Sequence, residues 1–211
     1  MASTAAPYGL RPVNLIGGQP YAGSTRLIKI ANAYAANIFY GQAVKSNGNG
    51  FIQADTSTTA LDPTGVIGVF VGCTYTDPGL KYKVFKQYWP TGTVATDAEA
   101  YVVDDPDVVM QVQADEAVAQ TAMGANIALV TSAGSTSTGN STTAADGSSV
   151  AATGTLPLRI VGFVDGPDSA VGDAYTDILV KWNMPYSNSS ATANAVVTMI
   201  GGHAYMNPTG V

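Results

Sequence analysis

Short apolar runs separated by turn residues extend along most of the chain and predict β-strands. In residues 108–113 and 177–183, more apolar and more polar positions alternate with a period of two, which is typical of strands with one buried face. Residues 66–76 are apolar at both parities, which indicates a strand covered on both faces. Further apolar runs predict strands near residues 27–30, 38–45, 51–53, 81–89, 127–130 and 158–164.

The order of these runs indicates the fold class. No crossover helices separate the strands, so the sequence predicts a mainly β protein with an antiparallel β-sandwich or barrel-like body. Helix is scarce. The best candidate has Asp115 as its N-cap, continues to Met123 and ends with Gly124 in the C′ position, which gives only two turns.

The first 25 residues differ from the rest because they are dense in proline and glycine. This density leaves no room for a regular element and predicts an extended N-terminal arm. Apolar side chains on such an arm must be buried against the body or a neighbouring subunit, because otherwise the arm stays disordered. The candidate contacts of the arm with a partner or a neighbouring subunit are Tyr8, Leu10, Val13, Ile16 and Tyr21.

Residues 26–183 form the predicted β-rich body, and residues 184–211 follow it as a C-terminal tail. Within the body, residues 133–154 are rich in Gly, Ser and Thr and almost uncharged, which favours a flexible exposed loop. The alternative is a long hairpin whose tip is ordered by contact with a neighbour. In the tail, residues 196–200 fit either a strand or a short helix.

The amino-acid composition suggests that the chain belongs to an assembly. Only 11% of the 211 residues are charged, against about 25% in an ordinary soluble domain. A chain so poor in charge either covers its surface with Ser, Thr, Asn and Gly or hides much of that surface against partners. Nine Lys and Arg against fifteen Asp and Glu give a net charge of -6, opposite to the basic surface that nucleic-acid binding requires. We therefore expect protein partners and no nucleic acid.

Membrane insertion and secretion are also not expected. The apolar runs are far shorter than the roughly 20 residues that cross a bilayer, and residues 1–6 lack the features of a secretory signal. A single cysteine, Cys73, cannot form an intrachain disulfide.

The residues that usually carry chemistry are few. We interpret Cys73, which lies in the most apolar run, as an inert core residue, and His203, the single histidine, as a surface or interface residue. Neither a nucleophile elbow nor a phosphate-binding glycine motif occurs, and one Cys with one His cannot supply a common zinc site. The sequence thus predicts a protein that is not an enzyme, with no catalytic, cofactor-binding or metal site.

Two groups of carboxylates, at residues 104–107 and 165–168, leave alternatives open. Each group contains Pro, and the second also Gly, so we interpret both as turns in which Asp side chains bond to the backbone. A calcium site at either group, at Asp104, Asp105 and Asp107 or at Asp165 and Asp168, is the first alternative. The acid–base pair of a glycosidase is the second.

Several segments together resemble one class of proteins. They are APYGLRPV at 6–13, IFYGQAVK at 38–45, residues 65–77, QYWP at 87–90, residues 104–115, TLPLRIVG at 155–162 and ILVKWN at 178–183. As a set, they are similar to small structural proteins in the virions of tailed bacteriophages infecting aquatic bacteria, and most of all to a head decoration, or cement, protein.

The resemblance implies a homotrimer on the outer surface of the phage head that clamps neighbouring subunits of the major capsid protein. One rival is the major capsid protein itself, but the chain lacks the long amphipathic helix that this fold needs. Another is a tail-fibre or receptor-binding module, which would favour carbohydrate binding on exposed aromatic residues such as Tyr88 and Trp89. A virion-associated hydrolase would have only the Asp clusters in its favour.

Overall fold

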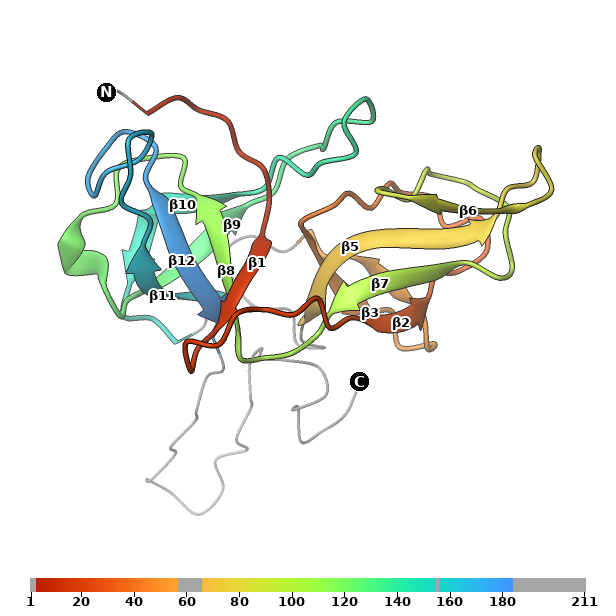
Figure 1. Ribbon diagram of the computed structural model, residues 1–211, viewed down its shortest axis with the longest axis horizontal. Coiled ribbons are helices and arrows are strands. Elements are labelled where there is room, and N and C mark those ends of the chain that lie inside the picture. The colour runs from red at the N-terminus through yellow and green to blue at the C-terminus, as the bar shows by residue number, and fades with distance from the viewer. Residues whose placement is uncertain (1–2, 57–65, 155, 184–211) are drawn as a thin grey trace, which may run out of the picture.

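The computed structural model describes residues 3–56, 66–154 and 156–183 (Figure 1). The protein is mainly β and consists of two antiparallel sheets packed together, as in a β-sandwich, which confirms the predicted fold class. The predictions for the C-terminal tail and for His203 lie outside the described residues.

The first sheet occupies the left half of the molecule in Figure 1. Its neighbouring strands all pair antiparallel. In spatial order they are β1 (Arg11–Leu15), β8 (Val108–Gln113), β12 (Asp177–Trp182), β11 (Leu158–Phe163), β9 (Asn126–Val130) and β10 (Ala144–Ala151).

The second sheet occupies the right half (Figure 1). In spatial order its strands are β2 (Arg26–Lys29), β7 (Glu99–Val103), β5 (Val66–Thr76), β3 (Gln42–Ser46) and β4 (Ile52–Ala54), and β6 (Lys83–Lys86) pairs with β5. β5 is long enough to pair with β7 along one edge and with both β3 and β6 along the other.

Two apolar clusters form the core, one on each face of the second sheet. In the first, Val66, Val69 and Val103 pack with buried residues of the first sheet and join the two sheets. The second cluster lies on the opposite face, where Trp89 covers strand residues and meets the ring of Tyr75 edge-on at 5.3 Å. β5 is therefore buried on both faces, as its apolar pattern predicted.

The N-terminal segment belongs to the body more than the sequence predicted. The expectation that residues 1–25 hold no regular element is wrong, because Arg11–Leu15 forms β1 and pairs with β8. Pro12 is tolerated because β1 is the edge strand of its sheet and its register shifts directly after Pro12. Upstream, the side-chain amide of Gln113 accepts the N–H of Ala6 and donates to the carbonyl of Thr4, so this part of the segment lies on the chain's own first sheet.

The predicted helix at residues 115–123 is also wrong, since only a single 3₁₀ turn forms there, at Gln120–Ala122. Asp115 does not cap a helix, because its carboxylate accepts the N–H of Gly147 in β10. The N–H of Val118 is likewise taken by the hydroxyl of Thr176. These tertiary hydrogen bonds hold the segment in a non-helical path, and only the left-handed backbone of Gly124 matches the prediction.

The interpretation of residues 133–154 as a loop is wrong for Ala144–Ala151, which forms β10 and pairs with β9. The residues before β10 form the tip of a long hairpin that reaches toward the second sheet (Figure 1). There the backbone of Tyr40 bonds to Gly139 and Ser141, and the side chains of Gln87 and Asn140 are 2.6 Å apart. The tip is thus held by contacts within the chain.

A substitution at Gly68 would test how tightly β5 packs against β7. A Cβ at this position would lie 2.0 Å from the backbone oxygen of Val103, a contact that cannot form without moving β7. We expect Gly68→Ala to lower the free energy of unfolding by about 2 kcal/mol or more, measured by urea denaturation. Gly166→Ala is the control, because a Cβ there meets nothing within 4 Å. Equal stability of the two variants would contradict the packing.

A substitution at Leu10 would test whether the N-terminal segment belongs to the core. Its side chain is fully buried in the first cluster, so Leu10→Ala should destabilise the protein by about 2–5 kcal/mol. Val13→Ala, in the same segment but 36% exposed, should cost less than about 1 kcal/mol. If Leu10→Ala unfolds at the same urea concentration as the unaltered protein, the segment is not part of the core.

Candidate functional site

The five contact residues predicted on the N-terminal segment separate into two groups. Leu10 is buried, and Tyr8 and Tyr21 are half-buried against the body. Val13 and Ile16 are 36% and 49% exposed. Only these last two offer a large apolar surface to a partner from this segment.

Tyr8 has a structural role in its own fold. The guanidinium of Arg11 lies 4.2 Å from the centre of its ring, a cation–π contact that helps fix the entry into β1. Burial, and then the negative charge of Asp177, raise the pKa of the Tyr8 hydroxyl well above its usual value. The residue therefore stays neutral and packs against the first sheet.

A second exposed apolar surface lies at the far end of the second sheet and was not predicted from the sequence. Phe85 on β6 is 65% exposed, and its ring lies over Gly72, where a Cβ would be 2.7 Å from it. Tyr101 on β7 is next to it, with 5.6 Å between the ring centres. Other exposed apolar side chains of the second sheet and its loops are Leu27, Leu80, Tyr82 and Val94. The sequence indicated this exposed surface in the run KYKVFK at 81–86, where two aromatic residues stand among three lysines.

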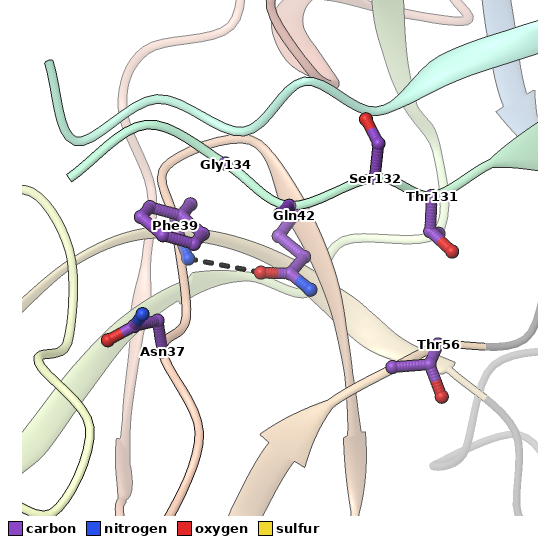
Figure 2. Close-up of a pocket in the computed structure, with 8 residues that line it drawn as sticks. Asn37, Phe39, Gln42, Thr56, Thr131, Ser132 and Gly134 are labelled. Carbon is purple, nitrogen blue, oxygen red and sulfur yellow. Dashed lines mark hydrogen bonds between the residues drawn. The ribbon is translucent and has the colours of Figure 1, made fainter.

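A hollow of about 350 Å³ lies beside the hairpin tip (Figure 2). Its lining is formed by Asn37, Phe39, Gln42, Thr56 and residues 131–134. The amide oxygen of Gln42 accepts the N–H of Phe39 at 3.1 Å, while the Phe39 ring stacks on Tyr88 and is covered by Gly134. The lining residues offer hydroxyl and amide groups and contain no charged side chain, so this wall can form hydrogen bonds but holds no acid or base.

The aromatic pair expected for a carbohydrate-binding module is not exposed as predicted, because Trp89 is buried and Tyr88 is half-buried. Trp89 is 0% exposed in the second cluster, and Tyr88 stacks on Phe39 with 5.6 Å between ring centres. Covering the second sheet requires a large apolar group, and Trp89 supplies it.

The carboxylates of residues 104–107 point to different partners. Asp104 pairs with Arg26, Asp107 lies 3.5 Å from Lys181, and Asp105 accepts the N–H of Asp107 as in an Asx turn. Residues 166–169 likewise close a tight turn through two backbone hydrogen bonds. Both groups thus lie in turns, and the predicted bond from an Asp side chain to the backbone is found in the first of them, at Asp105. In the described part of the chain, no group of three or more His, Cys, Asp and Glu side chains could hold a metal ion.

Cys73 is a core residue, as its apolar surroundings predicted. It lies in the second cluster, and its thiol is 3.6 Å from the carbonyl of Tyr88. Burial raises the pKa of the thiol to about 12.

In comparisons with known proteins, no family model, no curated protein and no solved structure matches the chain. The part of the chain that the structure describes contains no helix with the length and apolar character needed to cross a membrane.

The environment of Cys73 predicts its reactivity. With a pKa of about 12, only about one thiol in ten thousand is ionised at pH 8, whereas an ordinary thiol is about one quarter ionised. We expect Cys73 to remain unmodified by a thiol-specific chromogenic reagent in the folded protein and to react fully in urea. Rapid reaction in the folded protein, at the rate of a free thiol peptide, would contradict the burial.

Proposed function

We propose that this protein is a capsid decoration, or cement, protein. It binds as a homotrimer to the outer surface of a bacteriophage head and stabilises the shell by clamping neighbouring major capsid subunits. In this role the chain binds protein and carries out no chemical reaction. The sequence resemblance suggested the proposal, and the surface of the fold supports it.

The observation that carries the proposal is the exposure of large apolar side chains on a chain with very little charge. Val13 and Ile16 are exposed on the N-terminal segment, and Phe85 is the most exposed of those on the second sheet. Apolar side chains that are exposed together mark places where proteins meet other proteins. With only 11% charged residues, the chain has few charges to surround them.

A clamp of this kind works by mass action. It binds the assembled lattice and not the free capsid subunits, so it shifts the equilibrium toward the intact shell. Three linked copies add avidity, which allows each single contact to be weak. The net charge of -6 is compatible with this position, because the outer surface of a shell presents no genome phosphates to neutralise.

The proposal is tested by adding the purified protein to undecorated phage heads and sedimenting the particles. We expect co-sedimentation at hundreds of copies per head and a higher temperature of head disruption. A handful of copies at the tail would favour the tail-fibre alternative. Absence of binding to heads and tails would contradict both.

The exposed residues of the N-terminal segment give a sharper prediction. Val13→Ser with Ile16→Ser should weaken binding to heads by about tenfold or more, because two apolar side chains would no longer be buried in the contact. Circular dichroism should be unchanged, since neither side chain is in the core. Met123→Ser, an exposed apolar residue outside this segment, is the control and should bind normally. Full binding by the double variant would show that this segment is not the anchor.

A further inference from the structure

One end of the molecule combines exposed apolar side chains with positive charge. On the turn before β6 and on β6 itself, the exposed residues are Leu80, Lys81, Tyr82, Lys83 and Phe85, and we call residues 80–85 the β6 surface. Of the five exposed residues in this run, three are large and apolar, two are lysines, and none is acidic.

The carboxylates near the β6 surface already have partners. Asp97 is bonded by the hydroxyl and N–H of Thr76, and these bonds lower the pKa of its carboxyl. Glu99 lies 2.9 Å from Lys29, and that contact lowers the pKa of the Glu99 carboxyl.

Asp77, just before the β6 surface, accepts the N–H groups of Gly79 and Leu80. The charges of Lys81 and Lys83 also act on these neighbouring carboxylates and help to lower their pKa values. No ion pair between described residues includes Lys81 or Lys83, so both exposed lysines can still meet the carboxylates of a partner.

The opposite end of the molecule is acidic. The segment 115–119 lies beside the β11–β12 loop, since Val118 donates to Thr176 and accepts from Gly172. We call these two segments, with the start of β10, the acidic loops. Their carboxylates are Asp115, Glu116, Asp146, Asp165, Asp168 and Asp173, and no ion pair between described residues includes any of them.

The two surfaces lie at opposite ends of the long axis. In Figure 1 the turn before β6 is at the far right, while the 3₁₀ turn and the β11–β12 loop are at the far left. A single chain cannot bring them together, but two chains placed head to tail can.

The acidic loops also contain small apolar groups that can receive aromatic side chains. Ala117, Pro167 and Ala174 are exposed between the carboxylates. Phe85 and Tyr82 would pack on such groups while Lys81 and Lys83 meet the carboxylates, so the two ends are complementary in both polarity and charge.

We infer that the β6 surface of one copy docks on the acidic loops of the next. The occupant of the β6 surface is therefore a second copy of this chain, in a heterologous head-to-tail contact. Such contacts close into rings when the rotation between copies allows it, and three copies would form the homotrimer of the proposed function, on which this inference rests.

The test measures mass by analytical ultracentrifugation, with circular dichroism to verify folding. The unaltered protein should sediment as a trimer at micromolar concentration. It should dissociate as the salt is raised from about 0.1 M to about 1 M, because screening shortens from about 10 Å to about 3 Å. Lys81→Glu with Lys83→Glu should be folded and monomeric, and so should Asp165→Lys with Asp168→Lys.

Combining these four substitutions in one chain swaps the charges of the two ends and should restore the trimer. The control combines Lys81→Glu and Lys83→Glu with Asp107→Lys, Thr136→Lys and Ser137→Lys. It has the same net charge as the swapped chain, but its new lysines are at exposed positions outside the acidic loops, and it should stay monomeric.

Phe85→Ser, which removes the exposed ring, should also give a monomer. A trimer that survives both the lysine substitutions and Phe85→Ser would overturn the inference and leave the proposed function standing. Loss of head binding with an intact trimer would mean that the β6 surface contacts the capsid, and would overturn it too. A monomeric unaltered protein that still decorates heads would overturn both this contact and the trimer, but not the decoration role.

Discussion

The burial of β5 on both faces is the constraint on which the rest of the structure depends. One face of this strand packs with the first sheet, and the other is covered by the loop that carries Trp89. A strand without a solvent face must be apolar at both parities, and its neighbours must leave room for it. Gly68 meets that second condition, since any side chain there would collide with the backbone of β7.

The same constraint separates the two ends of the molecule. The part of the second sheet near Val69 and Val103 is covered by the first sheet, while the part near Phe85 and Tyr101 extends beyond it. The β6 surface exists because β5 continues past β3 and pairs with β6 there. The long central strand that joins the two sheets thus also leaves an uncovered apolar end.

In this weakly charged protein, short polar side chains that bond to the backbone stabilise the loops. The hydroxyl of Ser141 accepts the N–H of Thr143 and contacts the hydroxyl of Thr143, and both residues are buried. The amide of Asn183 donates to the carbonyls of Gly154 and Leu156. Such bonds satisfy loop backbone groups without ionic side chains. The exposed side chains of the described residues then include a few large apolar groups and the charges at the two ends.

Features that depend on neighbouring residues along the chain could be predicted from the sequence. Alternation with a period of two located β8 and β12, unbroken apolarity indicated the double burial of β5 and Cys73, and Asp with Pro indicated the turns. The other features depend on contacts between residues that are distant along the chain. β1 forms because β8 offers an open edge, and the segment after Asp115 stays non-helical because Gly147 and Thr176 take its hydrogen bonds. These partners lie far away in sequence, so their contribution to the free energy leaves no local pattern from which it could be predicted.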